Sequence, residues 1–248
     1  MSDEITDASN TKLAEHIAWT YFSLRFIMFG LSIAFPISLW VWSSWHFRNI
    51  EPGPSISGYY HAENEWIRDH FVGTLSAVGV CLIAYRGFSR WENILLNGAG
   101  FSLIGVAMFP TGVDQAPRMT LLDGSLELAT SANSSPITLH GVCAVLFFIC
   151  LAAVALTQAE HSLHLIEDPK IRRRFARRYR MIGGLMVFLP AIAWAALYLA
   201  KRHWGVFMVE ALGVFVFAGY WITKTLEYRR TNKRAEAILL CEPRRRKT

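Results

Sequence analysis

Cysteine is scarce in this sequence and has no pattern that would organise a fold. The 248 residues contain 4 cysteines, and their separations do not match those of a metal site. Three lie inside apolar runs and the fourth lies in the basic C-terminal stretch: Cys81, Cys143, Cys150 and Cys241. This placement argues against structural disulfides and against a cysteine-bound metal.

Signals of export and of repetition are also lacking. The chain opens on polar and acidic residues, MSDEITDASN, and no A-x-A cleavage site follows the first apolar run. A cleavable signal peptide is therefore not expected. No internal repeat is visible, and no low-complexity segment occurs outside the basic tail.

Apolar residues, in contrast, are abundant and gathered into long runs. They make up 53% of the chain, which also has 9 Trp and 16 Phe. Runs of about 20 residues match the ~30 Å hydrocarbon core of a bilayer at ~1.5 Å rise per residue. The sequence therefore predicts an all-α polytopic membrane protein, with six transmembrane helices in one bundle. The expected helices cover residues 24–45, 67–86, 92–110, 136–157, 181–200 and 204–223.

The apolar runs also divide the chain into three parts. A polar N-terminal lead over residues 1–20 has some amphipathic character and could lie along the membrane surface. The transmembrane domain is expected over residues 21–225, followed by a basic cytoplasmic tail over residues 226–248.

Most of the 25 Lys and Arg residues flank one side of the predicted bundle. They gather in the lead, the tail, the 86–91 turn and the 158–180 connector, whereas the connections 46–66 and 111–135 carry few. The positive-inside rule then places both termini in the cytoplasm. This flanking role explains the net charge of +6, so no nucleic-acid partner is expected. The connector arginines are expected to contact anionic membrane lipids: Arg172, Arg173, Arg174, Arg177 and Arg178.

Ionisable side chains collect near the predicted outer ends of three helices. Asp69 and His70 open the second helix, His140 lies near the start of the fourth, and Glu210 lies inside the sixth. An intramembrane charge costs at least about 2.5–3.5 kcal/mol, so it usually has a partner or a purpose. We expect these four residues to form a polar or ligand-binding cluster with three neighbours: Tyr60, His61 and Arg68.

Two interpretations of this cluster stay open. Arg68 could pair with Glu210, and His140 with Asp69, which would fix geometry more than it adds stability. Alternatively, zinc could bind three histidines with help from a carboxylate and activate a water for hydrolysis. The three are His61, His70 and His140. Membrane zinc hydrolases also carry a His-x-x-x-His in a late helix, and the last two predicted helices have no such pair.

Other cofactor signals are weaker. His161 and His164, at i, i+3 spacing, could place two imidazoles on one helical face at the cytoplasmic side. A b-type haem would need two deep axial histidines, and His140 has no obvious deep partner. No cofactor is therefore expected, with zinc as the alternative.

Several short motifs resemble those of a known group of proteins. They are S-I-S-x-Y-Y at 55–60, R-D-x-F-V-G at 68–73, Y-R-G at 85–87, G-V-A-M-F-P-T at 105–111 and L-H-G at 139–141. The chain resembles a group of uncharacterised bacterial six-helix membrane proteins, distantly similar to the FRAG/DRAM/SFK-type membrane proteins. The resemblance covers roughly residues 25–225. It implies the six-helix topology and a location in the bacterial cytoplasmic (inner) membrane, and it implies no catalytic residues.

The expected function follows from the lack of a complete catalytic constellation. We expect a non-catalytic membrane protein that binds a lipid or another membrane protein at an outer polar pocket, in a regulatory or accessory role. The alternative is a metal-dependent hydrolase acting on outer-leaflet lipid through the His/Asp/Glu cluster. A small transporter is disfavoured, because Glu210 is the only acid well inside a predicted helix and there is no repeat.

Overall fold

The structure, a computed structural model, describes residues 2–47, 53, 55–62, 64–109, 138–158, 163, 166–200 and 205–241. These residues form six α-helices and two short helical segments, and no strand occurs among them. The α-helices are α1 (Ser2–Phe47), α2 (Glu65–Ala84), α3 (Arg90–Met108), α4 (Leu139–Ala153), α6 (Pro169–Ala200) and α7 (Gly205–Cys241). The short segments are the 3-10 helix η1 (Ser57–His61) and the π-helical segment η3 (Val154–Gln158). The all-α prediction is confirmed for this part of the chain.

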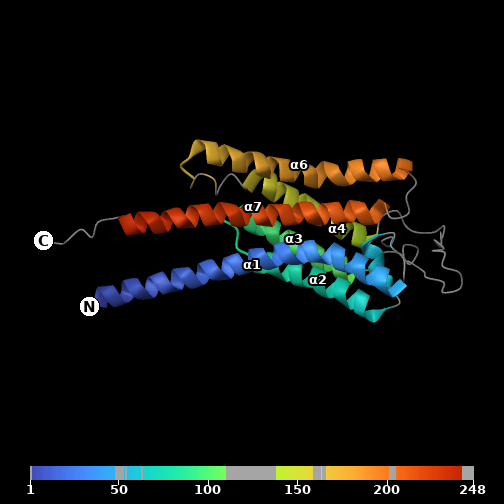
Figure 1. Cartoon of the computed structure of the whole chain (residues 1–248), viewed down its shortest axis with the longest axis horizontal. Coiled ribbons are helices and arrows are strands. Elements are labelled where there is room, and N and C mark those ends of the chain that lie inside the picture. Colours follow the sequence, from blue (N-terminus) through green and yellow to red (C-terminus); the bar gives the residue numbers. More distant parts are fainter. Residues whose placement is uncertain are drawn as a thin grey trace.

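The α-helices lie alongside one another, and the chain reverses direction from each to the next (Figure 1). α1 begins and α7 ends at the same end of the bundle, and η1 lies at the opposite end. We call these the terminal end and the η1 end. The polar lead predicted for residues 1–20 is part of α1 from Ser2 onward, and the predicted tail is helical as far as Cys241. Helical hydrogen bonding thus continues past the apolar runs at both ends of the chain.

Side-chain caps fix where α2 and α3 begin. Asn64 Oδ1 accepts a hydrogen bond from Trp66 N (3.0 Å), and Ser89 Oγ accepts one from Glu92 N (2.9 Å). The Glu92 carboxylate in turn accepts a hydrogen bond from Phe88 N at 2.8 Å. These bonds satisfy backbone donors that an α-helix leaves unpaired around its first turn.

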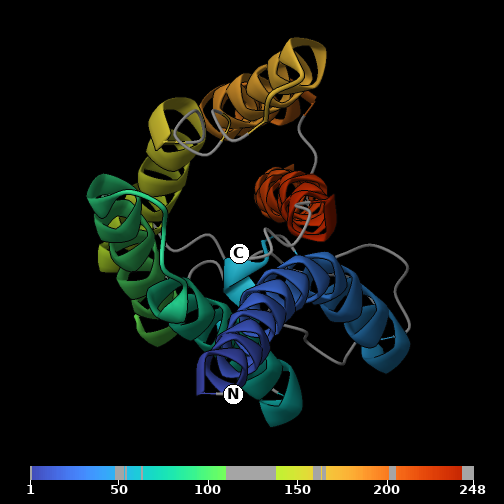
Figure 2. The ribbon, with the colours of Figure 1, turned by 90° about the vertical axis from the view of Figure 1, so that its left-hand side faces the viewer.

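The six helices form a closed ring. α1 packs on α2, α2 on α3, α3 on α4, α4 on α6, α6 on α7, and α7 again on α1. Viewed along the bundle, η1 lies within this ring (Figure 2). Ser57, Gly58 and Tyr59 of η1 are buried. η1 therefore fills part of the inside of the ring at this end.

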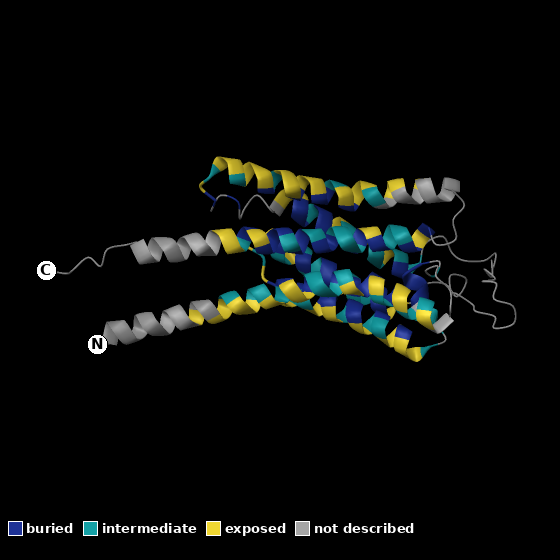
Figure 3. Ribbon diagram, in the orientation of Figure 1, coloured by how far each residue is buried: buried dark blue, intermediate teal, exposed yellow. Residues whose placement is uncertain are grey.

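Buried residues face the inside of the bundle, and exposed residues cover the outside (Figure 3). Many of the exposed side chains are large and apolar, among them Trp66, Phe101, Val145, Phe188 and Ile192. An apolar exterior of this extent suits the hydrocarbon of a bilayer and not water. Four stretches of helix are long and apolar enough to cross a membrane: His16–Trp42, Glu65–Ala84, Leu139–Thr157 and Gly205–Arg230. The chain is a membrane protein, and four of its six predicted spans correspond to these stretches.

Candidate functional site

The surface at the η1 end carries a pocket of about 610 Å³. Its lining comes from η1 and the first turns of α2: Tyr60, His61, Ala62, Arg68, Asp69, Val72 and Gly73. Tyr60, His61, Arg68 and Asp69 line its polar part, and Val72 and Gly73, one turn further along α2, line its apolar part. Four residues of the predicted cluster, two from η1 and two from α2, therefore share one pocket.

Arg68 and Asp69 interact with each other at this pocket. Arg68 donates to Asp69 Oδ1 from Nε (3.4 Å) and Nη2 (3.3 Å), and their side chains are 45% and 67% exposed. An exposed ion pair contributes only about 0–1 kcal/mol to stability, so both groups are free to rearrange around a ligand. The predicted pairs of Arg68 with Glu210 and of His140 with Asp69 are wrong, because Glu210 and His140 bond elsewhere.

Glu210 of α7 holds η1 in place. Its Oε2 accepts hydrogen bonds from Ile56 N (2.5 Å) and Ser57 N (3.4 Å), and its Oε1 accepts one from Ser57 Oγ (2.6 Å). The first N–H groups of a helix have no helical partner and carry partial positive charge. The Glu210 carboxylate therefore acts as a cap for η1, which explains why an acid lies this deep in α7.

His140, near the start of α4, is buried and bonded through both ring nitrogens. Nδ1 lies 2.9 Å from Phe109 O at the end of α3, and Nε2 lies 2.9 Å from Ser57 Oγ. Ser57 thus stands between His140 and Glu210. The three residues, which we call the η1 triad, join α4, η1 and α7 in one hydrogen-bonded chain.

His70 is bonded to α1. Its Nε2 lies 2.7 Å from Ser38 Oγ, and its ring packs near those of Phe35 and Trp42. Within the described residues, no group of three or more His, Cys, Asp or Glu side chains is arranged to hold a metal ion. His161 and His164 lie outside the described residues, and the zinc alternative stays a prediction.

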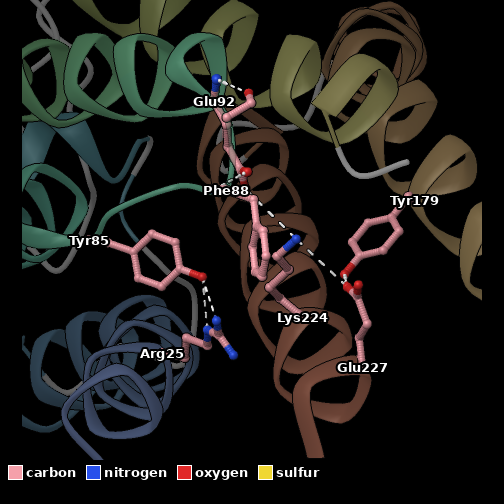
Figure 4. A network of polar contacts seen from close by, with 8 residues as sticks. Arg25, Tyr85, Phe88, Glu92, Tyr179, Lys224 and Glu227 are labelled. Carbon is pink, nitrogen blue, oxygen red and sulfur yellow. Dashed lines mark hydrogen bonds and ion pairs between the residues drawn. The ribbon is translucent and has the colours of Figure 1, made fainter. Parts of the chain in front are cut away.

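A second polar network lies inside the ring, toward the terminal end (Figure 4). Arg25 of α1 is 3% exposed and donates hydrogen bonds from Nε (3.0 Å) and Nη2 (2.6 Å) to Tyr85 Oη. The same guanidinium lies over the rings of Tyr85 and Tyr228, 5.2 and 4.7 Å from their centroids. Burial raises the pKa of Tyr85, which follows α2, to about 12, although Arg25 acts in the opposite direction. Tyr85 is therefore a neutral phenol at physiological pH.

Lys224 of α7 is the centre of this network. Its Nζ lies 3.8 Å from Glu92 Oε1 on α3 and 3.7 Å from Glu227 Oε2, one turn further along α7. Glu227 Oε2 also accepts a hydrogen bond from Tyr179 Oη of α6 (2.5 Å). The charged side chains are buried, so their mutual pairing must offset the cost of removing them from water. We call these residues, with the Arg25–Tyr85 pair beside them, the buried charge network. Its contacts join α3, α6 and α7 to one another, and α1 to the residue that follows α2.

Sequence reasoning missed this network. Glu210 is not the only acid enclosed by the helices, because Glu92 and Glu227 are buried. Each charge of the network lies at the edge of an apolar run, where a sequence pattern indicates a flanking residue in water. The balance of charges could have indicated it, because two cations and two acids lie at the terminal end of α1, α3 and α7: Arg25, Lys224, Glu92 and Glu227.

The basic surface predicted for the connector lies on α6. The five arginines are exposed over its first turns: Arg172, Arg173, Arg174, Arg177 and Arg178. Phe175 and Tyr179 are buried on the opposite face. The first half of α6 is therefore amphipathic, with its cations directed away from the bundle at the terminal end.

Residues 31–225 match the family described as "protein of unknown function (DUF998)". The chain belongs to the DUF998 family. No curated protein and no solved structure matches it. The range matched by the family contains the whole η1 triad, and Glu92 and Lys224 of the buried charge network, whereas Arg25 and Glu227 lie just outside it. The distant similarity to FRAG/DRAM/SFK-type proteins and the bacterial origin stay predictions.

Proposed function

We propose that this DUF998 protein crosses the bacterial cytoplasmic (inner) membrane six times and binds a lipid headgroup at the η1-end pocket, on the outer face. In this proposal the protein binds lipid in a regulatory or accessory role and does not catalyse a reaction. The observation that carries the proposal is the pocket, which sets charged groups beside an apolar helix face at the rim of a membrane bundle.

The ring supports six spans. α3 and α6 pack between candidate spans on both sides, α3 between α2 and α4 and α6 between α4 and α7. α3 has 19 residues, about 28 Å of helix at 1.5 Å per residue, close to the thickness of a hydrocarbon core. The exposed arginines of α6 lie toward the terminal end, which the positive-inside rule makes cytoplasmic. The η1 end then faces outward.

The charges of the pocket suit a zwitterionic phospholipid headgroup. The Arg68 guanidinium offers planar donors to a phosphate, and the adjacent Asp69 carboxylate can accept from an ammonium group. Val72 and Gly73 continue the lining along α2 toward the region of acyl chains. A volume of about 610 Å³ is also within the usual range for small-molecule sites, about 300–1,000 Å³.

The lipid that stays with the purified protein tests this binding role. The double variant Arg68→Gln/Asp69→Asn removes both charges and keeps polar side chains. Lys170→Gln is the control, because Lys170 is exposed at the terminal end and is not one of the five arginines expected to contact lipid. After exchange into lipid-free detergent, we expect wild type and control to retain phospholipid and the double variant to lose it, measured by mass spectrometry of the intact complexes. Equal retention of phospholipid by all three proteins would contradict the pocket as the lipid site. So would a second protein, and no lipid, bound to the purified wild type.

Cysteine labelling tests the topology separately. In a background without native cysteines, Asn64→Cys reports on the η1 end and Arg173→Cys on the terminal end. We expect a membrane-impermeant maleimide to label Asn64→Cys in intact cells and Arg173→Cys only after the membrane is opened. Labelling in the reverse order would overturn the orientation.

A further inference from the structure

The hydrogen bonds of the η1 triad restrict how many protons it can hold. Phe109 O can only accept, so His140 Nδ1 carries a proton, and only Nε2 is free to gain or lose one. Ser57 Oγ has a single proton. It can donate this proton to Glu210 Oε1 (2.6 Å) or to His140 Nε2 (2.9 Å), and not to both.

Two arrangements satisfy every bond of the triad. In the first, Glu210 is ionised and accepts from Ser57, and a doubly protonated His140 donates to Ser57 Oγ. In the second, Glu210 is protonated and donates to Ser57, which donates to a neutral His140. The arrangements interconvert when one proton moves from His140 to Ser57 while another moves from Ser57 to Glu210. Both carry no net charge and hold the same number of protons.

Any other number of protons breaks a bond. With one proton fewer, lone pairs face each other across one of the two Ser57 contacts, and a net negative charge lies among buried groups. With one proton more, the Ser57 hydroxyl proton loses both of its acceptors, and the net charge is positive. Either change is costly in an apolar medium, where unpaired polar groups and net charges are poorly solvated.

Among the described residues, the groups that bond to the triad from outside it are backbone groups, and the titratable neighbour is His61. Glu210 faces the backbone N–H groups of Ile56 and Ser57, which stabilise its oxygens and cannot titrate. His140 faces the Phe109 carbonyl and interacts electrostatically with His61 of η1, so positive charges on the two histidines repel each other.

We propose that the η1 triad is a proton-binding site, in which Glu210 and His140 share one exchangeable proton through Ser57. The bonding geometry alone carries this step. A second step rests on the function proposed above: Ser57 is at one end of η1, and Tyr60 and His61 of the same short helix line the pocket. Loss of the shared proton releases one anchor of η1, and so weakens lipid binding at the pocket.

The same end of the bundle offers a matched control. Ser38 Oγ contacts His70 Nε2 (2.7 Å), as Ser57 contacts His140, but its other partner is the carbonyl of Phe35 (2.9 Å) in place of a carboxylate. Ser38 therefore donates to that carbonyl and accepts from His70, which needs no shared proton. Ser38→Ala removes a Ser–His bond of this kind without touching the triad.

Nitrogen-15 NMR of histidine-labelled protein in lipid nanodiscs tests the proton site, with His140→Gln assigning the signal. Glu210→Gln keeps the shape of the side chain, and its amide donates to Ser57 as a protonated Glu210 does. Because the carboxylate charge is gone, we expect the proton affinity of His140 Nε2 to fall about 10- to 1,000-fold in this variant. Ser57→Ala should change it in the same direction, and Ser38→Ala should leave it unchanged. An identical His140 titration in wild type and Glu210→Gln would overturn the proton site, and so would an equal change in Ser38→Ala.

The retention of phospholipid across pH tests the link to the pocket. We expect wild type to lose lipid as pH rises through the His140 transition, and Glu210→Gln to lack that step. Retention with the same pH dependence in both proteins would overturn the link. Wild-type protein that retains no lipid at any pH, with the NMR difference intact, would refute the lipid function and uphold the proton site.

Discussion

Lys224 Nζ lies 3.8 Å from Glu92 Oε1, and this contact joins α7 to α3 across the inside of the ring. Both side chains are almost fully buried, with 2% and 1% of their surface exposed. Lys224 also contacts Glu227, and Arg25 donates its hydrogen bonds to a neutral phenol. The two cations therefore balance the two carboxylates over the whole network, and not as two separate ion pairs. A network of this kind is sensitive to the loss of a single member.

Replacing Lys224 by Met should destabilise the protein strongly. The substitution keeps much of the side-chain volume but leaves Glu92 and Glu227 buried without their shared cation. Breaking a buried pair by removing one partner costs about 3–5 kcal/mol. We therefore expect a clearly lower Tm for Lys224→Met in detergent. Lys170→Met, an exposed lysine on α6, is the control and should unfold as wild type does. Equal Tm values for all three proteins would contradict a structural role for the network.

Tyr85→Phe should weaken the attachment of α1 to the rest of the ring. The substitution removes the oxygen that accepts from Arg25 Nε and Nη2 and leaves a buried guanidinium with fewer partners. Such a loss costs about 1–3 kcal/mol. Tyr21, which packs edge-on against Tyr85, provides the matched control Tyr21→Phe. A free energy of unfolding that falls as much in the control as in Tyr85→Phe would show that the effect comes from the loss of a phenol hydroxyl in this ring pair and not from the hydrogen bonds to Arg25.

Wild type and Tyr85→Phe should also differ in how their stability depends on pH. The pKa of Tyr85 is raised from 10.0 to about 12, so the folded state holds the phenol proton more tightly than the unfolded state does. The contribution of Tyr85 to stability is therefore fully present below pH 10, and it is lost as pH rises toward 12. The stability difference between wild type and Tyr85→Phe should shrink over this window, measured by unfolding at a series of alkaline pH values. A difference that stays constant would mean that the two states bind the proton equally well.

Much of the fold could be predicted because a bilayer leaves few choices. The spans predicted at 67–86 and 92–110 begin and end within two residues of α2 and α3, since there the apolar run and the helix have the same length. The outer helices differ: α1 begins at Ser2 and α7 continues to Cys241. Hydropathy marks where the bilayer ends, whereas backbone hydrogen bonding decides where a helix ends, and the two coincide only where a turn interrupts the chain.

The candidate site could be predicted only in part. Helix direction and depth placed His140 and Glu210 at the same end, and the structure joins them through the η1 triad. The link itself, Ser57, is 153 positions from Glu210 in sequence and lies in a segment without periodicity, so no local pattern predicts the contact between them. The buried charge network escaped prediction for a similar reason. Whether a charge at the end of an apolar run faces water or the inside of a ring depends on which helices become neighbours.

A close approach of α2 and α3 depends on two glycines, Gly79 and Gly100, and Gly100→Ala tests it. A Cβ at Gly100 would lie 2.6 Å from Gly79 O and 2.7 Å from Ile83 Cγ1, and the backbone oxygen cannot move unless α2 moves with it. Small residues allow membrane helices to pack this closely, so a methyl group here should push the helices apart at a cost of about 1–3 kcal/mol. Gly30→Ala on α1 is the matched control, because a Cβ there meets nothing within 4 Å and alanine favours the helix. We expect the Tm to fall for Gly100→Ala and to stay level or rise for Gly30→Ala. A Gly100→Ala protein as stable as wild type would mean that α2 and α3 do not approach each other as closely as the structure places them.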